Sequence, residues 1–145
     1  MEQELLLYHG ADRPFKTLKA NQLTRSPSRS FLEVFWRKRG PIYLTPSLSF
    51  ALFFGSKKWW GKNMISIKKG IVYFSSFNPE KDVYIHVVDI SNIPKEKLVW
   101  INERELAVHL KEITPVRVET HKAGEISRYL EIVKDRKEFL LRRNE

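Results

Sequence analysis

Three short segments place side chains with acid–base, stacking or hydrogen-bonding chemistry at the ends of apolar runs. His9 and Gly10 end the first run, Tyr43 lies in the second, and Glu105 begins the third. An imidazole can bond a hydroxyl, a tyrosine ring can stack on a heteroaromatic ring, and a carboxylate can stabilise a developing positive charge. Because strand ends of a compact fold can meet at one edge, we predict that these residues converge on one site.

Each of these residues also has a purely structural interpretation. A histidine that ends an apolar strand is more commonly structural than functional, but the adjacent Gly10 lets the main chain approach a ligand closely. Glu103 and Glu105 both flank the third run. Glu105 is preferred because it directly begins the apolar strand, where a sheet would hold its carboxylate, whereas a solvated side chain is the alternative for either.

Aromatic residues follow Tyr43 on a predicted helix that begins near Ser47 and ends at Gly55. They surround the small Ala51 and are Phe50, Phe53 and Phe54. Most of them are expected in the core, but one ring facing Tyr43 would form a stacking slot for a heteroaromatic ring.

The three segments together resemble those of a known enzyme family. They are Leu7–Gly10, then Gly40–Thr45 with the helix at 47–54, and Asn102–Val108 with the strand at 116–118. Their order is similar to the His-Tyr-Glu signature of ADP-ribosyltransferases, in the branch of the poly(ADP-ribose) polymerases and diphtheria toxin.

The resemblance implies a split antiparallel β-sheet that binds NAD as a substrate. By this resemblance the Gly10 main chain holds the nicotinamide amide, and His9 bonds the adenosine ribose. Tyr43 stacks on the nicotinamide together with Phe53 or Phe54.

The resemblance also implies the remaining roles. Glu105 bonds the nicotinamide ribose and orients or deprotonates the acceptor, while Arg13 or Lys16 meets the pyrophosphate. Ala51 or Phe50 stands where the polymerases often have a serine that contacts the amide. The interval between Tyr43 and Glu105 is short, which favours single ADP-ribose transfer or hydrolysis over polymer elongation. A degenerate, non-catalytic relative is the alternative.

The charge of the chain permits a different function. The net charge is +9, with eight basic residues and one acid at 13–40 and five lysines without an acid at 56–69. This excess attracts phosphates or serves solubility. Three tryptophans beside these basic runs, at Trp36, Trp59 and Trp60, make a non-catalytic nucleic-acid-binding module an alternative. An enzyme resembling the RNA 2′-phosphotransferases is a further alternative, disfavoured because Tyr43 stands in place of a histidine.

Composition and periodicity predict the elements that must position these residues. The chain of 145 residues suits one domain over 1–145, of α+β class, with many strands and few helices. The strongest predicted strand covers 83–90, a hairpin turns at Lys69–Gly70, and a final helix spans about 125–143. The chain has no cysteine, no close pair of metal ligands, no signal-like start and no membrane-spanning run, so we expect a cytoplasmic protein without a metal or membrane partner.

Overall fold

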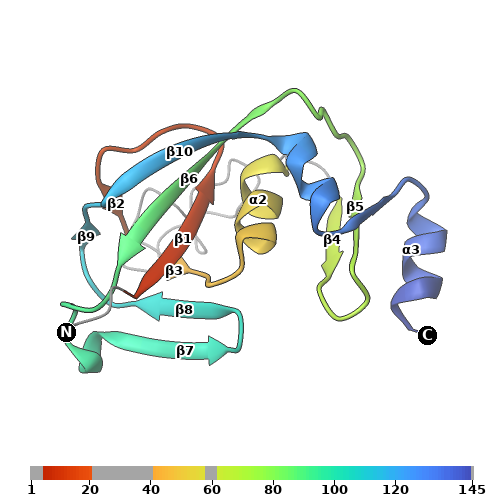
Figure 1. Ribbon diagram of the computed structural model, residues 1–145. Coiled ribbons are helices and arrows are strands. Elements are labelled where there is room, and N and C mark those ends of the chain that lie inside the picture. The colour runs from red at the N-terminus through yellow and green to blue at the C-terminus, as the bar shows by residue number, and fades with distance from the viewer. Residues whose placement is uncertain (1–4, 21–40, 58–61, 145) are drawn as a thin grey trace, which may run out of the picture.

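The computed structural model describes residues 5–20, 41–57 and 62–144. It is a mixed α+β fold with few helices, as the sequence pattern predicts, and its sheets are mostly antiparallel (Figure 1). The strands in chain order are β1 (Leu6–Ala11), β2 (Leu18–Lys19), β3 (Ile42–Leu44), β4 (Asn63–Ser66), β5 (Ile71–Phe74), β6 (Asp82–Asp89), β7 (Leu98–Asn102), β8 (Glu105–Val108), β9 (Glu112–Ile113), β10 (Arg117–Lys122) and β11 (Glu131–Val133). The helices are α2 (Leu48–Ser56) and α3 (Arg136–Arg143), with 3-10 turns η1 (Lys95–Lys97) and η2 (Ala123–Arg128).

The central sheet has the order β1-β6-β10, and both pairings are antiparallel. Strand β6 confirms the strand predicted at 83–90. Its residues Val83, Ile85 and Val87 point to one face of the sheet, and Val88 points to the other. Both faces are therefore apolar, which explains why this run lacks the alternation of a half-exposed strand.

Helix α2 packs across the first of these faces. Ser47 caps it by accepting a hydrogen bond from Phe50 N–H at 3.2 Å, as its position before the apolar run predicts. Gly55 was expected to end the helix, but it lies inside it, and the cap is Lys57. A Cβ on Gly55 would come within 2.3 Å of the Val83 side chain, so glycine is needed there for close packing on β6 and not for a turn.

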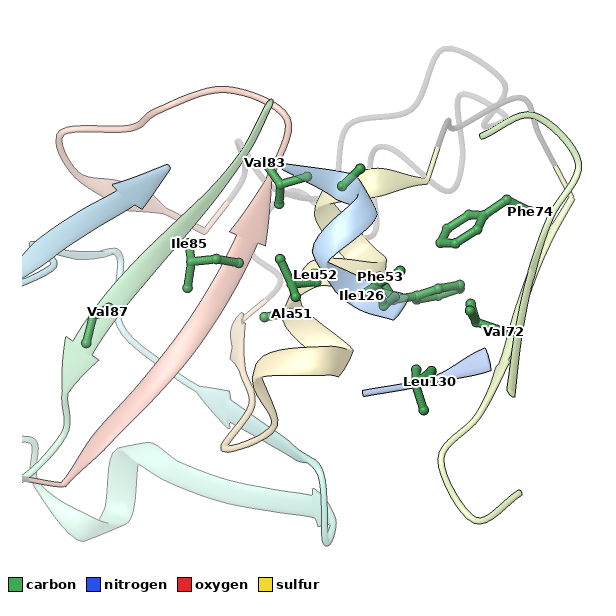
Figure 2. Packing of buried hydrophobic residues seen from close by; sticks show 11 residues of the cluster. Ala51, Leu52, Phe53, Val72, Phe74, Val83, Ile85, Val87, Ile126 and Leu130 are labelled. Atoms are coloured by element: carbon green, nitrogen blue, oxygen red, sulfur yellow. The ribbon is translucent and has the colours of Figure 1, made fainter. Parts of the chain in front are cut away.

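The α2 core lies between the central sheet and the sheet β11-β5-β4 (Figure 2). It contains Ala51, Leu52, Phe53, Val72, Phe74, Val83, Ile85, Val87, Ala123, Ile126 and Leu130. The helix thus has one side against β1 and β6 and the other side against β5 and η2.

The β3–β8 core lies on the second face of the central sheet. It contains Leu7, Leu18, Ile42, Leu44, Val88, Ile90, Leu106, Val108 and Ile113. The sheet β3-β8-β7 contributes its inner face, and the short pair β2–β9 contributes Leu18 and Ile113. The two cores share the central sheet as their common wall.

The hairpin predicted at Lys69–Gly70 is confirmed. Strands β4 and β5 pair antiparallel, and Gly70 takes a positive φ of 68°, which favours glycine.

The single helix predicted over 125–143 is wrong. The segment forms η2, then β11, then the shorter helix α3, with Asp135 as the cap of α3. Although its apolar residues have helical spacing, Ile132 and Val133 pair in parallel with Val72 and Tyr73 of β5. Pairing with a distant strand therefore overrides the local periodicity.

Several predicted features lie outside the described residues. They include the basic residues at 25–39 and the tryptophans Trp36, Trp59 and Trp60. Among the residues that are described, no helix is long and apolar enough to cross a membrane.

Candidate functional site

The candidate site lies where the central sheet meets the sheet β3-β8-β7. Tyr8 and Thr45 exchange two main-chain hydrogen bonds at 2.8 and 2.9 Å, which joins β1 to the end of β3. Within the described residues this bridge is isolated, since no further pair of β1 and β3 forms a ladder. The two sheets therefore begin to separate at Gly10 and Tyr43, the next positions along each strand.

His9 links the two strands just where the ladder stops. Its Nδ1 lies 2.9 Å from the carbonyl oxygen of Tyr43. Because a carbonyl oxygen only accepts, Nδ1 carries the proton and donates this bond. In the neutral ring Nε2 then keeps a lone pair, which can accept a hydrogen bond from a hydroxyl group.

A second histidine supports His9 from the neighbouring strand. His86 is the cross-strand partner of His9, and it is fully buried. Its Nδ1 donates to the carbonyl of His9 at 3.1 Å, and its Nε2 accepts from Phe15 N–H at 2.9 Å. Both nitrogens of His86 are satisfied by main-chain groups, so its tautomer is determined and one of its hydrogen bonds is made to the main chain of His9.

Both histidines are neutral at physiological pH. Burial lowers the pKa of His9 to about 4, against the opposing effect of its bond to Tyr43, and His86 nearby lowers it further. Burial likewise lowers the pKa of His86, opposed by its hydrogen bonds to the main chain of His9 and Tyr84. His9 is therefore suited to accept a hydrogen bond through Nε2 and is a poor source of protons.

Tyr43 and Glu105 share one face of the β3–β8 pair. Tyr43 lies directly opposite Ala107, and Glu105 lies two residues before Ala107 on β8. Directly opposed residues and residues two apart point to the same side of a sheet. The Tyr43 side chain is 40% exposed, and Glu105 is partly buried.

The structure does not place the His9 ring on that same face. Tyr8 opposes Thr45, which is two residues from Tyr43, so Tyr8 shares the Tyr43 face and His9 points to the other side. His9 reaches β3 through the main chain of Tyr43 instead. The three residues are thus brought to one junction of two sheets, with Tyr43 and Glu105 on one side of it.

Gly10 is held at this junction by the packing of α2. A Cβ at this position would stand 1.8 Å from the carbonyl oxygen of Ala51, so no side chain fits. Gly10 lies two residues after Tyr8, whose main-chain N–H and C=O point away from β6 and toward β3. Because the direction of the main-chain groups alternates along a strand, the N–H and C=O of Gly10 also face β3, as the predicted binding of a ligand amide by the Gly10 main chain requires.

The aromatic residues of α2 differ in their exposure to solvent. Phe53 is buried in the α2 core, where its ring lies 5.5 Å from that of Phe74, and Ala51 and Phe50 are buried as well. Phe54 is 40% exposed and carries the Lys57 ammonium 4.4 Å from its ring centroid. Among the described ring pairs none joins Tyr43 directly to Phe53 or Phe54, and of these two phenylalanines only Phe54 is exposed.

The predicted phosphate-binding side chains are exposed. Arg13 follows β1 and makes a surface ion pair with Asp12 at 3.3 Å, and Lys16 is exposed beyond it. Glu103, the alternative to Glu105, lies exposed in the turn between β7 and β8. Only Glu105 of the two glutamates is held in a strand.

Sequence reasoning missed His86 and the role of Thr45. His86 sits inside the most apolar strand, where a polar residue is uncommon, and that contrast is the signal that could have found it. Thr45 precedes Pro46, which favours an extended backbone, and its main chain forms the bridge to Tyr8.

A separate polar network lies on β10 and η2. His121 bonds to Glu125 at 2.6 Å through Nδ1 and to Glu119 at 3.0 Å through Nε2. Burial lowers the pKa of His121, but the hydrogen bonds and charges of the two carboxylates outweigh it and raise the pKa above its ordinary value. Among the described residues no group of histidines and carboxylates has the arrangement of a metal site.

Comparisons with known proteins return no relative. No protein-family model matches the chain. Neither the curated proteins nor the solved structures contain a match.

Proposed function

We propose that this protein is an NAD-dependent mono-ADP-ribosyltransferase. The observation that carries the proposal is the junction itself: His9 bonds the Tyr43 main chain at 2.9 Å where β1 and β3 separate, and Glu105 shares a face with Tyr43. A split sheet with a histidine, a tyrosine and a glutamate in this chain order is what the resemblance to ADP-ribosyltransferases implies. The mixed, mostly antiparallel fold is compatible with that family.

The state of His9 supports its role toward the adenosine ribose. A neutral imidazole that donates from Nδ1 to a carbonyl presents Nε2 as an acceptor for a ribose hydroxyl. A dinucleotide is long, with its two ribose groups far apart. His9 and Tyr43 can therefore serve opposite ends of NAD while pointing to different sides of the junction.

Glu105 would supply the electrostatic part of the reaction. The bond between nicotinamide and C1′ of its ribose breaks, and nicotinamide leaves neutral with the electron pair of that bond. Positive charge then builds on the ribose, as in glycoside hydrolysis, and a carboxylate stabilises it. The nucleophile of the acceptor forms the new bond to C1′, and its proton passes to Glu105.

Three side chains would complete the site. Tyr43, exposed on β3, offers its ring to the nicotinamide, and Phe54 is the α2 ring that remains accessible. Arg13 can exchange its exposed partner Asp12 for the pyrophosphate, since a surface pair contributes little to stability.

The first test is a measurement of NAD binding, with the thermal shift of the protein as the readout. We expect wild-type protein to be stabilised saturably, by about 3 kcal/mol at a hundredfold excess over Kd. Tyr43→Ala should lose this stabilisation, while Glu105→Gln should keep it because its carboxylate acts mainly in the transition state.

The second test is nicotinamide release. Glu105→Gln should slow it by about 100-fold or more. Glu103→Gln is the matched control, two residues away in the turn, and should keep full activity. No stabilisation at saturating NAD, or equal activity of Glu105→Gln and wild type, would overturn the proposal. Oligonucleotide binding with a steep salt dependence, in the absence of NAD binding, would instead support the nucleic-acid-binding alternative.

A further inference from the structure

Glu131 joins two segments that are far apart in the sequence. Its N–H donates to the carbonyl oxygen of Gly70 at 2.8 Å, in the turn of the β4–β5 hairpin. Its carboxylate accepts two hydrogen bonds from the Arg142 guanidinium, at 2.6 and 2.8 Å, in the last turn of α3. The hairpin turn and the end of α3 therefore lie at the same end of the sheet β11-β5-β4 (Figure 1).

Exposed basic side chains collect around this contact. Lys68 and Lys69 belong to the hairpin turn, Arg143 ends α3, and Arg128 ends η2 just before β11. These four residues are called the basic end below. Both oxygens of the Glu131 carboxylate bond to Arg142, so this ion pair contributes no net charge to it.

Positive charge is concentrated in the segments that build the basic end. Residues 62–74 hold three lysines and no acid, and residues 128–143 hold six basic and three acidic side chains. The intervening residues 75–127 hold seven basic and nine acidic side chains. The excess is therefore local, and a local excess of cations attracts the phosphates of a polyanion.

An exposed aromatic ring accompanies the basic end. Tyr129 follows Arg128 directly and is 52% exposed. Its N–H donates to the Ile126 carbonyl at 3.0 Å, and the next residue, Leu130, is buried in the α2 core, so the main chain here is fixed. An accessible ring beside basic side chains suits single-stranded nucleic acid, since bases stack on the ring while the cations neutralise backbone phosphates.

The packing of α3 disfavours a lipid surface as the partner. A helix that binds a membrane buries an apolar face of several residues in it. The apolar side of α3 is turned toward the protein: Phe139 is fully buried with Ile71 and Val133, and Leu140 is half-buried. Leu141 is the one apolar residue of α3 that is exposed, so this helix offers charge without a face for insertion.

We propose that the basic end and Tyr129 bind single-stranded nucleic acid. The four basic side chains neutralise backbone phosphates, and the Tyr129 ring stacks on a base. Because neither contact reads a base edge, the surface binds with little sequence preference. It lies on the β4–β5 turn, η2 and α3, whereas the candidate site lies on β1, β3 and β8, so the proposal does not depend on NAD binding.

The test is the fluorescence anisotropy of a labelled oligo-dT of about 12 nucleotides, titrated with the full chain at several salt concentrations. Each neutralised phosphate of a single strand adds about −0.7 to the slope of log association constant against log salt concentration, so four contacts predict a slope of about −2.8 or steeper. Affinity should then fall about 50-fold or more between about 50 and 200 mM salt. The double variant Lys68→Gln, Arg143→Gln should make the slope shallower by about 1.4 and weaken binding at least tenfold at low salt.

The matched control removes the same charge elsewhere. Lys95→Gln with Lys97→Gln changes two exposed lysines of η1, which precedes β7 and lies away from α3 (Figure 1). This control should leave both the affinity and the slope close to those of wild type. Tyr129→Ala should weaken binding about tenfold with an unchanged slope, because stacking releases no counterions, and Tyr129→Phe should bind as wild type does.

Three outcomes would overturn the proposal. The first is an equal loss of affinity in the double variant and its control, since binding would then depend on net charge alone. The second is a Tyr129→Ala variant that binds as tightly as wild type. The third is no oligonucleotide binding at low salt, and binding of phosphatidylserine vesicles in that case would assign the surface to membranes instead.

Discussion

At the scale of single residues, the protonation state of the candidate site is set by main-chain groups. His9 and His86 lie opposite each other on β1 and β6, and the Nδ1–H of each ring donates a hydrogen bond to a main-chain carbonyl oxygen. Neither bond needs a charged ring. Burial disfavours the imidazolium form of both residues, so both rings make these hydrogen bonds in their neutral form near neutral pH.

This predicts a loss of stability in mild acid. The pKa of His9 in the folded protein, about 4, is below its unfolded value, so the unfolded chain takes up a proton first as the pH falls. The free energy of unfolding should therefore decrease from about pH 6.5 toward pH 4. Unfolding by urea measured at several pH values should show it.

His9→Gln separates this effect from the titration of other groups. Glutamine can donate to the Tyr43 carbonyl without titrating, so between about pH 6.5 and 5.5 the variant should lose roughly 1 kcal/mol less than wild type. Parallel pH profiles for the two proteins would contradict the assignment of a low pKa to His9.

At the scale of elements, the site depends on how closely α2 approaches β1. Gly10 touches the main chain of α2 at Ala51, and Gly55 of α2 touches β6 at Val83. Neither glycine has a positive φ, so both are required by the space between elements. The Tyr8–Thr45 bridge follows from this docking, because β3 leads directly into α2.

Substitution at Gly10 should therefore be far more costly than at a turn. Gly10→Ala would place a Cβ 1.8 Å from the Ala51 carbonyl oxygen. We expect it to lower the free energy of unfolding by about 3 kcal/mol or more, because main chain must move. Gly70→Ala meets no atom within 4 Å and should cost only about 1 kcal/mol, for its positive φ.

Chemical unfolding of the two glycine variants measures this difference. Similar losses in Gly10→Ala and Gly70→Ala would show that α2 does not pack on β1 as described. An intact fold in Gly10→Ala with weakened NAD binding would locate the strain at the proposed site.

At the scale of the whole molecule, the histidines respond to pH in opposite directions. His121 lies between Glu119 and Glu125, where β10 leads into η2, and these two carboxylates favour its charged form. Its folded pKa is above its unfolded value, so its contribution to stability is present below the unfolded pKa and is lost as the pH rises through the folded pKa. The pKa values of His9 and His86 are lowered on folding, so their contributions to stability are lost as the pH falls.

We therefore expect a stability maximum at about pH 6.5, where neither effect operates fully. His121→Gln should remove about 1 kcal/mol below that pH and flatten the decline above it, since it lacks the charge that the carboxylates favour. Thermal unfolding at pH values on both sides of the maximum tests this. A decline above the maximum that is equally steep in His121→Gln and wild type would contradict it.

Local signals predicted those parts of the fold that local interactions determine. Ser47 predicted the start of α2, Gly70 predicted the turn between β4 and β5, and the apolar run of β6 predicted a buried strand. The α+β class was predicted from the many strands and few helices, and the sheets of the structure are mostly antiparallel. At the candidate site, the sequence supplied the residue types that could carry chemistry, and it predicted correctly that Glu105 begins a strand.

The remaining features were decided only by the tertiary structure, because they depend on contacts between segments that are far apart in the sequence. Parallel pairing with β5 turned the segment 131–133 into a strand, although its periodicity was helical. Packing against Phe74 removed Phe53 from the site, and the alternation of β1 directed His9 away from the Tyr43 face. The link from His9 to the Tyr43 carbonyl depends on the register between strands, which no local pattern specifies.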